Sequence, residues 1–409
     1  MRLQAEPPVH LTYCLNIHPG ETWEENLRAI RDKSLVVRDR VAPQQEFGLG
    51  LRLSYRAARA LHQPDALRAF REFLRENRLY VFTVNGFPFG DFHGKPVKDD
   101  VYRPDWRSAE RRDYTLILAE ILSQLLPEDA EGSISTVPGS YKGWVRGKDD
   151  VETMVRMLAD CACGLAEIRR RTGRLVHLGL EPEPDCFVEN TDEVIDFLTG
   201  PLIGHGSEYL RKDADLSAPE ADRVLREHVG VCVDTCHLAV EFEDPTRAIG
   251  RLTEAGIRVS KVQLSSALRT RPTPEARAEL AAFSDPVYLH QVKARRPDGT
   301  TRDYADLTEA LASPEEPAGA RDEWRVHFHV PLFFERTGSL RSTASLLTPE
   351  FFRTMRAGVT QHLEIETYTF DVLPPSLRRE DVTAAIAREY DWVLDRLGTA
   401  AGGKGSLGE

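Results

Sequence analysis

The sequence lacks any run of about 18 consecutive apolar residues, the length that a helix needs to cross a bilayer. Its opening residues, Met-Arg-Leu-Gln-Ala-Glu, contain no apolar core of the kind found in secretory signal peptides. We therefore expect a soluble, cytoplasmic protein.

Cysteine is scarce, with 6 residues in a chain of 409. A disulfide-held secreted domain would be far richer in cysteine, and a structural zinc site needs a paired spacing that is missing here. The cysteines fall in stretches expected to form core strands or a helix: Cys14, Cys161, Cys163, Cys186, Cys232 and Cys236. The sequence thus predicts reduced core thiols.

Positively charged residues are also fewer than negatively charged ones. The chain has 53 Lys and Arg against 65 Asp and Glu, a formal net charge of -12. Proteins bind nucleic acid largely through cationic side chains that displace counterions from the phosphates. Nucleic acid is therefore not an expected partner.

Apolar strand-like runs alternate regularly with helical patterns. Thr22, followed by Glu25, is a candidate N-cap for the first helix. Eight repeating strands are predicted at residues 9–18, 47–54, 79–84, 132–137, 175–181, 230–236, 259–265 and 361–367. Helices are predicted near 65–77, 107–125, 149–172, 191–198, 219–228, 245–256, 349–357 and 380–396. Such alternation and length predict an α/β fold, a (β/α)8 TIM barrel.

The regular alternation of strands and helices is interrupted before the last strand. Residues 266–323 carry loop signals and one short strand at 287–292, and are predicted to be an insertion within a single domain spanning 1–399. An additional strand is expected at 324–331, and 400–409 is expected to be a flexible tail. The aromatic, glycine-rich stretch 85–94 after the third strand is expected to cover a site.

Polar residues stand where several predicted strands end. In a barrel these ends converge on one mouth, where carboxylates and imidazoles together suit a divalent ion such as Zn²⁺, Mn²⁺ or Fe²⁺. We predict a metal site formed by Glu181, Asp234, His237, Gln263, His329 and Glu366, with Glu181 and Glu366 also catalytic. Alternatively, Glu181 pairs with a basic residue, His237 caps a helix, or Gln263 orients substrate.

Other polar residues are candidates by position alone. His327 and His329 alternate in an apolar run and share one face of an extended chain, although one of them could simply bond to backbone carbonyls. The predicted substrate-binding residues are His18, His93, Lys142, His290, His327 and Glu364.

The order of these strand-end residues resembles the xylose isomerase-like TIM-barrel superfamily, which includes sugar isomerases, epimerases and endonuclease-four-type nucleases. The resemblance implies that Glu181, Asp234 and Glu366 are metal carboxylates with His237 beside them. Gln263 stands where a metal-binding histidine is usual. In the nuclease branch His93 and His327-Phe-His329 would match further ligands, but the fourth strand ends in Val137-Pro138-Gly139 without a histidine. A complete trinuclear cluster is therefore not expected.

Three strings also resemble the EboE family of bacterial metabolite-traffic proteins: Leu11-Thr-Tyr-Cys-Leu-Asn-Ile-His-Pro-Gly-Glu-Thr-Trp23, Val326-His-Phe-His-Val-Pro-Leu-Phe333 and His362-Leu-Glu-Ile-Glu-Thr-Tyr-Thr369. This resemblance implies a role beside a membrane-bound prenyltransferase-like partner in traffic of a secondary-metabolite precursor.

Together these features favour a metal-dependent barrel protein acting on a small sugar-like or otherwise oxygenated metabolite with isomerase- or epimerase-like chemistry. One alternative is a non-catalytic carrier that holds the metabolite for a membrane partner. A third interpretation, less favoured because of the net charge and the missing histidine, is an abasic-site endonuclease-like phosphodiesterase.

Overall fold

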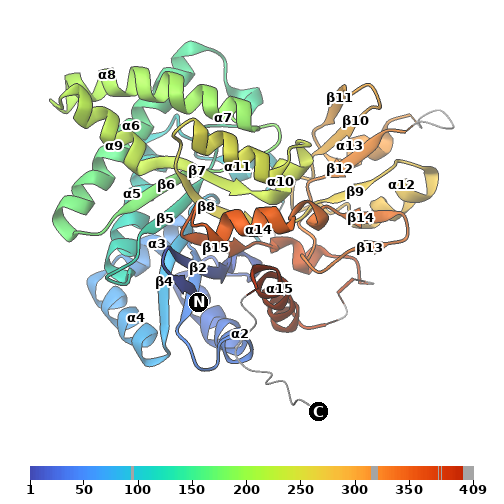
Figure 1. Cartoon of the computed structure of the whole chain (residues 1–409), viewed down its shortest axis with the longest axis horizontal. Helices are drawn as coiled ribbons and strands as arrows, with labels where there is room; N and C mark the ends of the chain where they lie inside the picture. The colour runs from blue at the N-terminus through green and yellow to red at the C-terminus, as the bar shows by residue number, and fades with distance from the viewer. Residues whose placement is uncertain (94–95, 315–320, 376, 379, 399–409) are drawn as a thin grey trace.

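The computed structural model describes residues 1–93, 96–314, 321–375, 377–378 and 380–398 (Figure 1). Eight parallel strands follow one another around a barrel in the order β2, β15, β8, β7, β6, β5, β4 and β3. Their bounds are β2 (Pro8–Tyr13), β3 (Phe47–Arg52), β4 (Leu79–Asn85), β5 (Gly132–Thr136), β6 (Val176–Leu180), β7 (Val229–Asp234), β8 (Val259–Leu264) and β15 (His362–Ile365).

The barrel closes between β2 and β3. A parallel bridge joins Cys14 to Gly50, and the hydroxyl of Thr12 donates to the carbonyl of Gly48 at 2.8 Å. Gly50 has no room for a side chain, because an added Cβ would lie 2.9 Å from the carbonyl oxygen of Tyr13. The predicted (β/α)8 barrel is confirmed. One short strand outside the prediction, β1 (Arg2–Ala5), pairs antiparallel with β2.

Helices form the outer layer (Figure 1). The capping box predicted at Thr22 and Glu25 is present, and every predicted helix forms. The helices of the outer layer are α1 (Trp23–Ala29), α2 (Leu35–Val41), α3 (Tyr55–Leu61), α4 (Pro64–Glu76), α5 (Ala109–Leu125), α6 (Lys148–Thr172), α7 (Thr191–Phe197), α8 (Ile203–Asp213), α9 (Ala218–His228), α11 (Pro245–Glu254), α14 (Pro349–Arg356) and α15 (Val382–Leu397). The short helix α10 (Thr235–Val240) directly follows β7 and is buried throughout. In the ranges that the structure describes, no helix is long and apolar enough to span a membrane.

The barrel interior is unusually polar. Near its N-terminal end the imidazole of His362 stacks on His177 with 5.7 Å between ring centroids. One level higher, the ammonium of Lys261 pairs with the carboxylate of Glu364, and both side chains are fully buried. The six cysteines are free thiols, and five of them are buried as predicted, whereas Cys163 is only half-buried. This polar column leads to the C-terminal mouth.

The insertion between β8 and β15 forms a second, antiparallel sheet beside the barrel (Figure 1). Its strand order is β11, β10, β12, β9, β14 and β13, with bounds β9 (Leu268–Thr270), β10 (Val292–Arg295), β11 (Thr301–Tyr304), β12 (Glu323–Val326), β13 (Arg336–Thr337) and β14 (Leu340–Ser342). Helices α12 (Pro274–Leu280) and α13 (Leu307–Ala312) pack with it.

Two strand predictions in this region were wrong in extent. The strand predicted at 324–331 ends at Val326, and the chain beyond it makes only isolated backbone bonds, from His327 to Gln291 and from Val330 to Ser266. The strand predicted at 287–292 begins only at Val292, because the preceding backbone turns around the carboxylate of Asp285. The tail predicted at 400–409 lies outside the described residues.

Candidate metal centre

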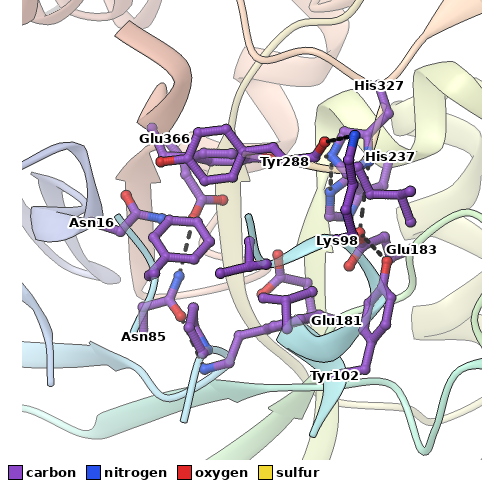
Figure 2. Close-up of a pocket in the computed structure, with 17 residues that line it drawn as sticks. Asn16, Asn85, Lys98, Tyr102, Glu181, Glu183, His237, Tyr288, His327 and Glu366 are labelled. Atoms are coloured by element: carbon purple, nitrogen blue, oxygen red, sulfur yellow. Dashed lines mark hydrogen bonds and ion pairs between the residues drawn. The ribbon is translucent and has the colours of Figure 1, made fainter. Parts of the chain in front are cut away.

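Six of the predicted residues meet at the C-terminal mouth of the barrel, four of them labelled in Figure 2. Parallel strands deliver the carboxylates to one edge, since Glu181 follows β6, Asp234 ends β7 and Glu366 follows β15. The imidazoles come from α10 and from the chain after β12: His237, His327 and His329. All six side chains are buried.

The three imidazoles turn the same ring nitrogen inward. The Nδ1 of His237 bonds to the carbonyl of Pro182 at 2.9 Å, and that of His329 bonds to the carbonyl of Glu366 at 2.9 Å. Carbonyl oxygens only accept, so both Nδ1 atoms carry the proton and both Nε2 atoms present a lone pair.

The Nδ1 of His327 is also held by an acceptor, in this case the side-chain amide of Gln291. Its Nδ1 lies 2.6 Å from Oε1 of Gln291, whose Nε2 donates to the carbonyl of Pro184 and thereby fixes the amide orientation. The Nε2 of His327 lies 3.1 Å from that of His237 and 3.3 Å from that of His329. Three lone pairs at such distances need a cation or an added proton between them.

The nitrogen spacing suits a metal ion. Two nitrogens bound about 2.1 Å from a tetrahedral ion are separated by about 3.4 Å. The bonds that fix the Nδ1 atoms are the outer contacts usual for metal-binding histidines. The thiol sulfur of Cys236 lies within 4.8 Å of a ring nitrogen of His327 and of one of His329.

The carboxylates form the other half of the cluster. Oxygen atoms of Glu181, Asp234 and Glu366 lie within 4.8 Å of one another. The Oε2 of Glu181 and the Oδ2 of Asp234 are buried without a hydrogen-bond partner. Because like charges this close repel, the group needs protons or a cation.

The carboxyl groups differ in charge. Burial, reinforced by Asp234 against the opposing effect of His237, raises the pKa of Glu181 to about 8. Burial and the neighbouring Glu181 raise the pKa of Glu366 well above its usual range. For Asp234 burial acts in the same direction, but His237 and His329 outweigh it and lower the pKa. Asp234 is therefore the favoured anion of the three, and a pKa of about 8 leaves Glu181 mostly neutral around pH 7 in the absence of metal.

Asp234 is also held by its own loop. Its Oδ1 accepts from the backbone N–H groups of Cys236 and His237 and from the hydroxyl of Ser265, at 2.7 to 2.9 Å. It thus caps α10 while its second oxygen stays free. The pKa of His237 is raised in return, because Asp234, Glu183 and Glu181 together outweigh burial.

Sequence reasoning missed two amides at the site. Asn16 and Asn85 donate to the same Oε1 of Glu366 at 2.7 and 3.0 Å, which aims this carboxyl group (Figure 2). Asn85 ends β4 and Asn16 follows β2, so the strand-end rule that found Glu181 could have found both.

A second missed group lies on the other side of the histidines. Glu183 accepts from the hydroxyl of Tyr102 at 2.8 Å and forms a further candidate ligand set with His237 and His327. Gln291 donates to the same hydroxyl at 3.1 Å. The network ties the insertion to the loops after β4 and β6.

A cavity of about 50 Å³ opens on the cluster, enough for a few water molecules. Its cover is an aromatic triad of Phe92, Tyr288 and Tyr368, with ring centroids 5.1 to 5.4 Å apart. The loop after β4 contributes Phe87 as well as Phe92 to the lining. The triad joins three segments that are distant in sequence.

The remaining predicted residues do not line this cavity. Gln263 is fully buried, with its Oε1 accepting from the thiol of Cys232 at 2.9 Å, and Glu364 pairs with Lys261 below the site. His18 contacts the hydroxyl of Tyr13, and Lys142 pairs with Glu189 and Glu193 near the surface.

Two other predicted histidines support cavity residues from outside. A ring nitrogen of His93 lies 2.7 Å from the carbonyl of Asn16, and one of His290 lies 2.8 Å from the carbonyl of His327. Both contacts fix backbone beside the site rather than present a side chain to the cavity.

Comparisons with known proteins give a fold likeness only. No protein-family model and no curated protein matches the sequence. Similar solved structures include a xylose isomerase-like TIM barrel protein from Mycobacterium smegmatis in complex with magnesium (12% identity, TM-score 0.49, covering 96% of this chain and 97% of that chain). Others are the IOLI protein with a binding zinc atom (10%, 0.48, 95% and 98%) and a D-tagatose 3-epimerase-like protein (11%, 0.47, 95% and 98%).

Proposed function

We propose that the chain is a divalent-metal-dependent enzyme that isomerises or epimerises a small oxygenated molecule by moving a proton beside a carbonyl group. The observation that carries this proposal is the buried cluster at the barrel mouth. Three imidazole lone pairs and three carboxyl groups converge there, and two of the carboxyl groups have a raised pKa.

The donor set fits a borderline divalent ion. Asp234, His237 and His329 would hold it, with Glu181 and Glu366 adding oxygens, and such mixed sets suit Zn²⁺, Mn²⁺ or Fe²⁺. When bound, the ion would polarise a substrate carbonyl and so acidify the neighbouring C–H bond.

Glu181 and Glu366 are suited to move the proton. They stand on different strands around one cavity, so they reach a bound molecule from two sides. In the metal-free protein the pKa of Glu181 is about 8, and a bound cation would lower it toward the ionised form that accepts a proton from carbon. The amides of Asn16 and Asn85 orient Glu366 and leave its second oxygen for substrate or metal.

The lining sets the substrate class. Beside the carboxyl groups, imidazoles and amides of the site, the cavity is walled by aromatic and aliphatic side chains, among them Phe87, Val101 and Leu289. Lys98 and Tyr102, labelled in Figure 2, also line it, with the ammonium of Lys98 bonded to Asp306 and the hydroxyl of Tyr102 bonded to Glu183. The volume of about 50 Å³ is far below the roughly 300 Å³ at which ligand pockets begin. A small polyol or keto compound would fit only after the aromatic triad parts.

The resemblance to the EboE family extends the proposal to the role of the protein in the cell. It suggests that the substrate is a secondary-metabolite precursor, passed on in the cytoplasm to a membrane-bound prenyltransferase-like partner. The sequence stretches that support this part of the proposal include residues of β2 and of β15, which form part of the barrel wall.

Proton transfer from carbon can be tested without knowing the substrate. Metal-loaded protein would be incubated in D₂O with a panel of small aldoses, ketoses and 2-keto acids, and deuterium incorporation followed by NMR. We expect exchange at one carbon with at least one compound, lost in Glu181→Gln and retained in Glu193→Gln, a surface change of the same chemistry. Saturable binding without exchange would instead support the carrier function.

A further inference from the structure

A row of cationic side chains crosses the insertion sheet. Directly opposite partners are Lys293 and Arg325, Arg325 and Arg269, Arg269 and Arg341, and Arg341 and Arg336. Opposite residues of antiparallel strands share a face, with Cβ atoms about 5 Å apart. Five positive charges therefore lie in one line across five strands.

Two of the five charges are compensated. Lys293 lies 3.2 to 3.5 Å from four carboxylates, including those of Asp185 and Glu241. Arg325 donates to Glu323 at 2.8 Å and to the carbonyl of Ala239 at 2.7 Å.

The other three are not. Across the described part of the chain, Arg269, Arg341 and Arg336 have no carboxylate within ion-pair distance. The Nε of Arg269 is buried without an acceptor, and its terminal nitrogen makes only a 3.4 Å contact with Ser345. Like charges directly opposite one another destabilise a sheet, so this arrangement favours an anion that the chain itself does not supply.

These three arginines face a groove of about 660 Å³, a size typical of small-molecule sites. Arg396 of α15 brings a fourth guanidinium, against a single carboxylate, Glu335, in the lining. The groove also has an apolar wall, formed by Phe334, Leu347, Pro349, Phe352 and Trp392. No residue of this groove lines the metal cavity.

We propose that this groove binds an organic phosphate, with adjacent phosphate groups on the arginine row and an apolar or aromatic body against the half-buried Phe334 and Trp392. Guanidinium forks bind phosphate oxygens in pairs, and several in line suit a diphosphate. Helix α14 begins in the same groove with its cap Thr348 and adds the positive end of its dipole. The groove's volume of about 660 Å³ matches a small molecule better than an extended acidic peptide.

Inorganic pyrophosphate is the first probe. Calorimetric titration would use protein treated with chelator, so that a metal in the barrel cannot bind the probe. We expect saturable binding that weakens with added salt, at least about tenfold weaker in Arg341→Gln. The control Arg302→Gln removes one exposed charge from the same sheet outside the groove and should leave the affinity unchanged.

The apolar wall is tested separately. Phenyl phosphate should bind more tightly than inorganic phosphate, and Trp392→Leu should remove most of that difference. The proposal is overturned if millimolar pyrophosphate shows no saturable binding, or if Arg341→Gln binds it as well as the unchanged protein. Binding of polyglutamate or of phosphatidylglycerol vesicles, without binding of pyrophosphate, would likewise refute a small-molecule site. None of these results depends on the barrel's metal chemistry.

Discussion

Replacing Glu181 with glutamine should change how the stability of the metal-free protein depends on pH. The neutral carboxyl group of Glu181 is favoured in the folded state, where its pKa is about 8 instead of the ordinary 4.5. An acid whose pKa is raised by folding contributes full stability below its unfolded pKa. That stability is lost as pH rises from about 4.5 through about 8, since only the unfolded chain then releases the proton freely.

The size of the effect follows from the two values. From 4.5 to neutral pH is roughly 2.5 pH units, which at about 1.4 kcal/mol per unit corresponds to about 3 kcal/mol. Glutamine has a similar shape and no ionisation, so Glu181→Gln should raise the stability of the metal-free protein near pH 7 by up to this amount. Glu366 titrates together with Glu181, and therefore part of the slope remains.

Urea unfolding of chelator-treated protein at about pH 5, 6, 7 and 8 measures this slope. Buried histidines with a lowered pKa, such as His10 and His329, also titrate in this range, so the comparison between variants carries the test. The stability that Glu181→Gln gains over the unchanged protein should grow from pH 5 to pH 8, while the control Glu193→Gln should follow the unchanged protein. Added Zn²⁺ or Mn²⁺ should abolish this advantage of the variant, since metal binding favours the ionised carboxylate. Identical slopes for Glu181→Gln and the unchanged protein would refute the charge assignment.

Three further changes test the surroundings of the site. Phe92→Ala should cost about 3 kcal/mol and speed metal extraction by a chelator, because it breaks the aromatic cover; an unchanged extraction rate would argue against that cover. Gln263→His should lower stability by about 1–3 kcal/mol without raising metal affinity, since it removes the acceptor for Cys232; calorimetry and melting curves decide. Lys261→Met should cost about 3–5 kcal/mol in urea unfolding, and adding Glu364→Leu should recover much of it; no recovery would mean that packing, rather than charge, dominates.

The barrel could be predicted because local signals agree along the chain. Apolar runs of strand length, each followed by a helical pattern, leave few alternatives to parallel strands covered by helices. Once that fold is assumed, Glu181, Asp234 and Glu366 must meet, since each stands at the C-terminal end of a strand. The sequence therefore predicts the carboxylate half of the cluster without any long-range information.

The imidazole half depends on contacts that local patterns do not encode. His327 and His329 share a face whether the chain forms a strand or merely stays extended, so the pattern predicted a strand where β12 had already ended. Their lone pairs point inward only because Gln291 and the carbonyl of Glu366 hold the Nδ1 atoms. Glu183 could not be oriented from the sequence because Pro182 interrupts the strand before it.

Gln263 and Glu364 show a second reason why the sequence predicts the site only in part. Both stand on inward-facing positions near strand ends, as the true cluster residues do, but one level deeper in the barrel. There Glu364 meets Lys261, and Gln263 meets Cys232. Depth within the barrel is set by strand register, which the sequence of one strand alone does not reveal.

The metal content of protein purified without chelator tests the central claim most directly, with Asp234→Asn as the comparison. Asparagine keeps an oxygen that can accept from Cys236, His237 and Ser265, so the loop stays capped while the anion is lost. Elemental analysis should find at least about one equivalent of Zn, Mn or Fe per chain in the unchanged protein and far less in the folded variant. An unchanged protein that stays metal-free even after incubation with these ions, or a variant that retains the same content, would contradict the assignment.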